Sequence, residues 1–245
     1  MIIEYKKEKE KPVIYIFKYI DGKRIIEKIT GFKPYFYVLQ NEIVPSLPQI
    51  ISVEEGNFTS LFGEKLKKII VKLPENVPEI RTKFKKTFEA DVVFTERFTI
   101  DKIKTIPYEK LRVQYLDIEN DDSLDTDFTP KPITVIGTYD NFLNKYVFFS
   151  WREDKEKLEL KEDKISSYIF NNEIDMIKSY ISFLQNTNPD IITGWNVEMF
   201  DMKYIINRME KLKLNNKLLS PIKEVNIHQN VVVKGRIIFN LFDGY

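Results

Sequence analysis

The sequence of 245 residues contains no cysteine and a single histidine, His228. Thiolate chemistry, ordinary zinc sites and most Ser-His-Asp arrangements are thereby excluded. Any metal chemistry in this chain has to be carboxylate chemistry.

An excess of charge of one sign is also missing, because 38 Lys and Arg residues face 37 Asp and Glu residues. Contact with a nucleic acid would therefore depend on local patches rather than on overall charge. The N-terminus becomes charged too early for a secretory signal, and no run of about 18 apolar residues follows it. We expect a cytoplasmic protein whose hydrophobic content of 43% supports two domains or one large one.

Residues 1–107 are predicted to form a small α+β domain. Its expected strands are three β-rich runs, at 12–17, 35–39 and 68–73. Asn76 and Pro78 indicate the start of a helix that runs to about Lys86. Residues 100–107 are typical of a connection, and we place the domain boundary at Pro107.

From residue 108 onward, strands are predicted to alternate with helices. The expected strands are residues 112–119, 132–139, 145–151, 190–193 and 231–239, and the expected helices start near 172 and 197. The second and third strands are expected to form a hairpin around 140–144, and the charged run 153–164 a solvated loop or helix face. This order favours an α/β fold with a mixed sheet of the ribonuclease H-like kind.

The sharpest local signal is the pair Asp117 and Glu119, which alternate with apolar Leu116 and Ile118. Residues two apart on a strand point to the same face, so the two carboxylates are expected to lie side by side. Like charges this close repel, and a hard divalent cation such as Mg²⁺ or Mn²⁺ between them is the usual remedy. Alternating charged and apolar residues are also common on half-buried strands, so a purely structural interpretation stays open.

A third carboxylate follows a predicted strand break. The strand ends at Gly194 and a helix begins near Val197, which places Asp201 in the first turn of that helix. A helix N-terminus favours a carboxylate by itself, so Asp201 has a structural interpretation as well. That alternative does not account for Asn196 and Phe200 beside it.

Together, Asp117-Ile118-Glu119 and the later Asn196, Phe200 and Asp201 resemble the first and second exonuclease motifs of archaeal-type family B DNA polymerases. Their order and separation fit this family. The run 233–241 is similar to the strand that comes next in archaeal members, where Asp usually stands in place of Asn240. Residues 32–39 match as well, so the resemblance covers essentially the whole chain.

The resemblance implies a proofreading 3'–5' exonuclease that uses two Mg²⁺ or Mn²⁺ ions on DNA. Asp117 would bridge the two ions, and Glu119 and Asp201 would complete their coordination. Asn196 and Phe200 would hold the frayed 3' end of the primer strand, through stacking and backbone contacts that suit any mismatched base.

The family's third exonuclease motif, a Tyr followed four residues later by an Asp, is expected after the last strand and does not occur before Tyr245. Residues 108–245 therefore resemble an exonuclease domain that is incomplete at its C-terminus, in a fragment of a polymerase or in a naturally separate piece. We expect weak or no nuclease activity from these residues alone. In a full-length enzyme the remaining polymerase domains, and a sliding clamp, would be partners.

The resemblance also implies a pocket in residues 1–107 that captures uracil in the single-stranded template. The matching positions in this chain are Tyr5, Pro34, Tyr35, Val77, Val92, Phe94 and Arg97. Small walls from Val77 and Val92 would leave no room for the methyl group of thymine, as selection of a flipped base requires.

Several of these pocket residues have other interpretations. Tyr35, Val92 and Phe94 suit the core of a β-sheet. Arg97 suits a phosphate contact or a surface salt bridge with Asp91 or Glu96, its neighbours in the sequence.

Three functions remain open from the sequence. The chain is the N-terminal and proofreading region of a DNA polymerase, a binding module for uracil in single-stranded DNA without catalysis, or a free-standing 3'–5' exonuclease with an acidic site. The missing third motif speaks against the free-standing exonuclease.

Overall fold

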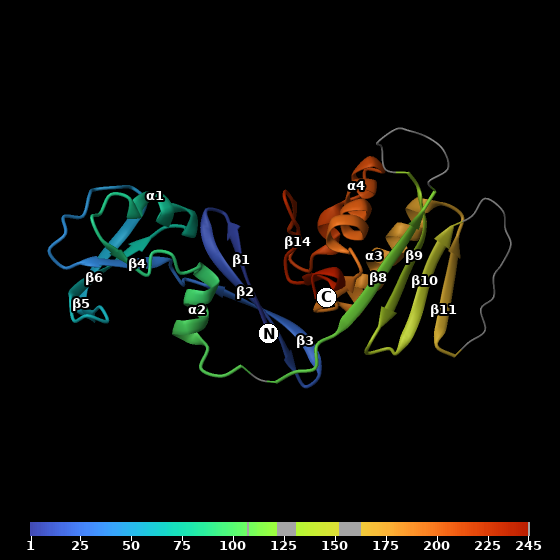
Figure 1. Cartoon of the computed structure of the whole chain (residues 1–245), viewed down its shortest axis with the longest axis horizontal. Helices are drawn as coiled ribbons and strands as arrows, with labels where there is room; N and C mark the ends of the chain where they lie inside the picture. The colour runs from blue at the N-terminus through green and yellow to red at the C-terminus, as the bar shows by residue number, and fades with distance from the viewer. Residues whose placement is uncertain (107, 122–130, 152–162, 245) are drawn as a thin grey trace. The chain divides into compact units, whose positions relative to one another are not determined.

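The computed structural model describes residues 1–106, 108–121, 131–151 and 163–244. The chain divides into two compact units, Met1–Tyr108 and Glu109–Tyr245 (Figure 1). Pro107, where the sequence analysis places the boundary, lies outside the described residues, and so does almost all of the charged run 153–164.

The first unit contains two separate antiparallel sheets. A three-stranded meander consists of β1 (Ile2–Glu8), β2 (Lys11–Ile20) and β3 (Lys23–Thr30). The second sheet has the order β5-β6-β4-β7, with β4 at Tyr35–Leu39, β5 at Ile50–Thr59, β6 at Lys65–Val71 and β7 at Thr87–Phe88. The strands predicted in the three β-rich runs are confirmed as parts of β2, β4 and β6.

The helices of the first unit differ from the prediction. A 3₁₀ turn (Pro74–Asn76) leads into α1 (Val77–Arg81), so the expected helix to Lys86 is wrong in length. The chain leaves α1 early because β7 pairs with β4. The reading of residues 100–107 as a connection is also wrong in part, because α2 spans Phe94–Lys102. Its apolar pattern is interrupted, since Ile100 is 67% exposed, and the helical period is therefore hidden in the sequence.

The second unit is built on one six-stranded sheet with the order β11-β10-β9-β8-β12-β15. Its strands are β8 (Val113–Asn120), β9 (Ile133–Asp140), β10 (Lys145–Trp151), β11 (Ile165–Phe170), β12 (Ile191–Gly194) and β15 (Ile237–Asn240). The pairs β8·β9 and β9·β10 are antiparallel, whereas β12 runs parallel to β8 and β15. The predicted mixed α/β sheet, including the hairpin between β9 and β10, is confirmed.

The helices of the second unit cover the sheet and hold its core. They are α3 (Glu173–Thr187), a π-helical turn η2 (Glu198–Met202), α4 (Lys203–Lys211) and the 3₁₀ turns η3 (Asn216–Leu219) and η4 (Leu241–Gly244). The side chain of Asn172 caps α3 by accepting a hydrogen bond from the Asp175 amide. The apolar face of α3 packs on β9, β10 and β11, and Ile177, Tyr180 and Leu184 are fully buried. None of the helices within the described ranges has the length and apolar character needed to cross a membrane.

The last predicted strand, 231–239, is interrupted in the structure. A two-stranded ribbon of β13 (Val225–Ile227) and β14 (Val231–Val233) precedes β15. The chain turns between β14 and β15 at Gly235, whose φ of +85° favours glycine. The expectation of one continuous strand is therefore wrong at this turn.

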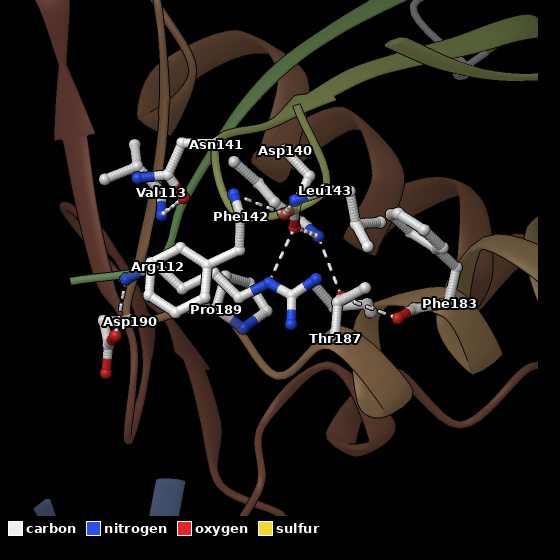
Figure 2. Close-up of polar contacts among 12 residues, drawn as sticks. Arg112, Val113, Asp140, Asn141, Phe142, Leu143, Phe183, Thr187, Pro189 and Asp190 are labelled. Carbon is white, nitrogen blue, oxygen red and sulfur yellow. Dashed lines mark hydrogen bonds and ion pairs between the residues drawn. The ribbon is translucent and has the colours of Figure 1, made fainter. Parts of the chain in front are cut away.

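A buried polar network fixes the start of β8 (Figure 2). The fully buried carboxylate of Asp140, at the end of β9, accepts hydrogen bonds from Arg112 Nε and Gln114 Nε2, each at 2.9 Å. It also accepts the amides of Phe142 and Leu143, each at 3.0 Å. Gln114 donates further to the Thr187 hydroxyl at the end of α3. The Asp140 carboxylate therefore joins the start of β8 to the β9–β10 turn, and Gln114 connects this network to α3.

These contacts also set the protonation of Asp140. Burial alone would raise the pKa of Asp140, but the hydrogen bonds from Arg112, Gln114 and the Leu143 amide outweigh burial, so the pKa is lowered. The carboxylate is thus charged in the folded protein down to lower pH than in the unfolded chain.

We predict that Asp140→Asn destabilises the second unit by about 3 kcal/mol. The substitution removes one partner of a buried ion pair and leaves the charge of Arg112 without its counter-charge. Urea unfolding followed by circular dichroism measures this. The wild-type advantage should be fully present above the unfolded pKa of about 3.9 and lost as the pH falls through the lower folded pKa. Asp163→Asn, at an exposed position, is the control and should change little; equal stability of both variants at neutral pH would contradict the prediction.

Candidate active site

The carboxylates of β8 lie on the open face of the sheet. Asp117 and Glu119 are exposed, while Leu116 and Ile118 between them are 3% and 5% exposed and belong to the core. The predicted alternation of the two faces is confirmed. Asp117 and Glu119 are therefore held by a strand whose other face is fixed by packing.

Asp201 reaches the same strand from the loop after β12. Its Oδ1 accepts a hydrogen bond of 3.0 Å from the backbone amide of Ile118, the residue between Asp117 and Glu119. Asp201 is 4% exposed. The three predicted carboxylates are thus organised around one peptide group of β8.

A π-helical turn delivers Asp201, whereas the sequence predicted the first turn of an ordinary helix. The Met202 amide donates to the Val197 carbonyl at 2.8 Å, a bond that spans five residues. Such a widened turn is rare and occurs often at functional sites. It places Asp201 inward while Met199 and Phe200 on the same turn stay exposed at 47% and 45%.

The electrostatics of the site favour a proton or a cation at Asp201. Burial raises the pKa of Asp201 to about 6, and the negative charges of Asp117 and Glu119 act in the same direction. The hydrogen bond from the Ile118 amide opposes them only in part. The three carboxylates therefore repel one another within the folded protein.

The donor set fits the hard divalent cation that the sequence predicts. Carboxylate oxygens are the ligands that Mg²⁺ and Mn²⁺ prefer, and a cation would relieve the repulsion among the three carboxylates. Within the described ranges, however, no three His, Asp or Glu side chains are already gathered closely enough to hold an ion. An ion at this site would have to draw the β8 carboxylates toward Asp201.

Gly194 allows the close approach on which this arrangement depends. A Cβ atom at Gly194 would lie 2.5 Å from the Leu116 carbonyl oxygen of β8. Only a shift of the backbone could relieve this clash. The bare backbone of Gly194 thus lets the end of β12 lie directly against β8, so that the following turn reaches Ile118.

The residues predicted to hold a DNA end lie at the surface of this turn. Asn196 and Phe200 are exposed, and the Phe200 amide donates to the Asn196 carbonyl at 2.9 Å. The Phe200 ring lies 5.8 Å from the Tyr204 ring. Trp195 beside them is 60% exposed and packs edge-on against Phe242. The open aromatic surface next to Asp201 is available for stacking.

Asn240 has a structural role that the sequence did not indicate. Its side-chain oxygen accepts from the Glu198 amide at 2.8 Å, and its side-chain nitrogen donates to Asp243 at 3.0 Å. An Asp at this position would accept only, and its charge would face Asp243. The Asn240 side chain thus fixes the start of the turn that carries Asp201, and its amide nitrogen suits the neighbouring Asp243 carboxylate.

In the first unit, contacts join four of the seven predicted pocket residues as two pairs. The Tyr5 and Phe94 rings meet edge-on at 5.4 Å, and the Arg97 guanidinium lies 5.1 Å from the centre of the Tyr35 ring. Phe94 and Arg97 are both 7% exposed and lie one turn apart on α2. Phe94 begins a helix and does not belong to a β-sheet.

The ion pairs of Arg97 differ from those expected from the sequence. Its guanidinium bonds Glu89 at 2.5 Å and lies 3.8 Å from Asp101, rather than pairing with Asp91 or Glu96. The Tyr35 hydroxyl donates to Asp101 as well, at 2.6 Å. Burial and this hydrogen bond raise the pKa of Tyr35, so the ring stays neutral.

The two contact pairs do not include the other three predicted pocket residues, Pro34, Val77 and Val92. Pro34 is buried and its carbonyl accepts the Val71 amide at 3.0 Å, while Val77 packs against the core of the four-stranded sheet. Val92 is half-buried just before α2. A cleft of about 640 Å³ in this unit is lined by other residues, among them Tyr37, Phe58 and Phe88.

The chain is similar to known DNA polymerases. Residues 136–240 match the model of the family "DNA polymerase family B, exonuclease domain", a range that includes Asp201 and begins after Asp117 and Glu119. A DNA polymerase of Pyrococcus glycovorans is 28% identical over 98% of this chain and 33% of its own length. A DNA polymerase of Thermococcus sp. (strain GE8) is 30% identical over 98% of this chain and 15% of its own length.

The fold also matches a solved structure. The family B DNA polymerase of the archaeon Pyrobaculum calidifontis aligns with a TM-score of 0.73 over 99% of this chain and 36% of that chain, at 19% identity. The present chain thus spans about a third, or less, of the length of the polymerases it matches.

We predict that Gly194→Ala disrupts the approach of β12 to β8, because the added methyl collides with a backbone oxygen. Overpacking of this kind costs about 1–3 kcal/mol of stability. Amide hydrogen exchange of Ile118 should accelerate as its bond to Asp201 is strained. Gly244→Ala, where a Cβ meets only the Phe239 ring at 3.9 Å, is the matched control; unchanged exchange at Ile118 in Gly194→Ala would refute the role given to Gly194.

Proposed function

We propose that this chain is part of a family B DNA polymerase and that its second unit is a proofreading 3'–5' exonuclease domain acting on DNA, as supported by the family match over residues 136–240. We further propose that the first unit, through residue 107, is a domain that binds the single-stranded template. The observation that carries the nuclease proposal is the hydrogen bond between Asp201 and the Ile118 amide, which joins the two motif regions at one peptide group.

In this proposal Asp117, Glu119 and Asp201 hold the divalent cations, Mg²⁺ or Mn²⁺. When bound, these ions supply a nucleophilic water and stabilise the leaving 3'-oxygen. The buried Asp201 contributes a ligand whose position is fixed by the Ile118 amide, and Asp117 and Glu119 contribute ligands from the exposed face of β8.

The surface of the η2 turn supplies the contacts to the strand. Phe200 presents an exposed ring on which a terminal base can stack, and Asn196 presents an amide beside it. Stacking and amide contacts of this kind do not depend on the base, which suits removal of any mismatched nucleotide. The remaining domains of a polymerase, and a sliding clamp bound by the whole enzyme, are the proposed protein partners.

A second proposed function is recognition of uracil in the template by the first unit. Its support is the packing of Tyr5 on Phe94 and of Tyr35 on Arg97, which brings together aromatic and cationic groups from three separate elements. The flat rings would hold a flipped base, and Val77 and Val92 would exclude the thymine methyl group.

We predict that Mn²⁺ stabilises the second unit and that Asp117→Asn removes most of this effect. Binding to the folded state alone adds about 2.7 kcal/mol at a cation concentration of 100 times Kd. Thermal unfolding with and without Mn²⁺ measures it without requiring nuclease activity. Glu198→Gln, on the same turn as Asp201, is the matched control and should respond to Mn²⁺ as the wild type does; an unchanged response in Asp117→Asn would contradict the metal assignment.

Binding of single-stranded DNA tests the second proposal. A strand carrying one uracil should bind roughly tenfold more tightly than the same strand with thymine, the order of selectivity that one methyl group provides. Val92→Phe should abolish the preference by filling the pocket, as measured by fluorescence anisotropy. Ile100→Phe, at an exposed position of α2, should retain it. Shortening from the 3' end without uracil preference would favour a self-contained exonuclease instead.

A further inference from the structure

Three tyrosines form a row across the open face of the six-stranded sheet in the second unit. Tyr115 on β8, Tyr139 on β9 and Tyr146 on β10 are directly opposite one another in the strand register. Their ring centroids are separated by 6.0 Å for Tyr115 and Tyr139 and by 4.9 Å for Tyr139 and Tyr146. We call these three residues the tyrosine row.

The tyrosine row shares a cavity with the β8 carboxylates. This cavity of about 310 Å³ is lined by the row together with Asp117, Glu119 and Phe148. The residue opposite Asp117 on β9 is Gly137, and the residue opposite Gly137 on β10 is Phe148. A Cβ at Gly137 would meet the Phe148 ring at 3.2 Å, so the ring lies over the glycine, next to Asp117. Aromatic surface thus continues from the row to the carboxylates.

Core packing does not account for the tyrosine row. The apolar core lies on the opposite face of the sheet, with Leu116, Ile136 and Val147. Tyr115 and Tyr146 are 44% and 49% exposed, so their rings keep accessible faces. Cross-strand aromatic pairs stabilise a sheet by less than about 1 kcal/mol, which explains their contact with each other but not the exposed rings beside Asp117.

We propose that the tyrosine row binds nucleobases of a single-stranded DNA whose 3' end lies at Asp117 and Glu119. This inference rests on the exonuclease function proposed above and adds a base-stacking subsite to it. Tyr115 precedes Asp117 by two residues on β8, a step of about 6.6 Å along a strand. The row therefore lies within a nucleotide's reach of the carboxylates.

The chemistry of the row fits a nucleic acid strand. Aromatic faces stack with every base, and tyrosine hydroxyls donate hydrogen bonds to phosphate oxygens. A DNA strand bound there would pass over the aromatic rings to the acidic site.

The test is the affinity of the whole chain for a short 5'-fluorescein-labelled oligothymidine, measured by anisotropy in EDTA so that no cleavage occurs. Tyr115→Ala/Tyr146→Ala should raise Kd roughly tenfold or more, because base stacking on an aromatic ring is lost at two positions. Tyr115→Phe/Tyr146→Phe keeps both rings and should bind within about twofold of the wild type.

Tyr168→Ala is the matched control, since Tyr168 is 51% exposed on the same sheet but stacks on the core residue Phe149. Its Kd should be that of the wild type, with circular dichroism confirming that every variant is folded. Wild-type affinity in the double alanine variant would overturn the tyrosine row while leaving the proposed nuclease intact. Failure of the wild-type chain to bind the oligothymidine would overturn both.

Discussion

The hydrogen bond between Asp201 and the Ile118 amide is the interaction on which the candidate active site depends. The β8–β12 ladder ends where Thr193 pairs with Tyr115, so the amide of Ile118 lacks a strand partner on that side. A buried amide without a partner is costly, and Asp201 satisfies it. The hydrogen bond that satisfies the Ile118 amide also brings the third carboxylate toward Asp117 and Glu119.

The surrounding structure makes the hydrogen bond between Asp201 and the Ile118 amide possible. The arrangement places three negative charges near one another, which is electrostatically unfavourable. Gly194 permits the backbone contact with Leu116, the π-helical turn directs Asp201 inward, and Asn240 fixes the start of the turn. At the far end of β8, Asp140 anchors the strand through Arg112 and Gln114. Repulsion of Asp201 by Asp117 and Glu119 remains in the folded protein.

The sequence predicted the parts of this site whose signals are local. The alternation of Asp117 and Glu119 with buried residues follows from strand periodicity, and the strand break at Gly194 from turn chemistry. What it could not predict depends on distant contacts: the backbone clash that requires Gly194, the Glu198 amide that Asn240 satisfies, and the alignment of Tyr115 with Tyr139 and Tyr146. The helix α2 was missed for the same reason. Arg97 is buried there because it contacts Glu89 and Tyr35, and the periodicity of the sequence does not reveal these contacts.

The most direct measurement is anomalous X-ray scattering from crystals of this chain grown with Mn²⁺. If Asp201, Asp117 and Glu119 form one metal site, the anomalous difference map will show manganese between the Asp201 carboxylate and the exposed face of β8, with the Ile118 hydrogen bond retained. Manganese bound only elsewhere, or carboxylates that stay apart in saturating Mn²⁺, would contradict the account.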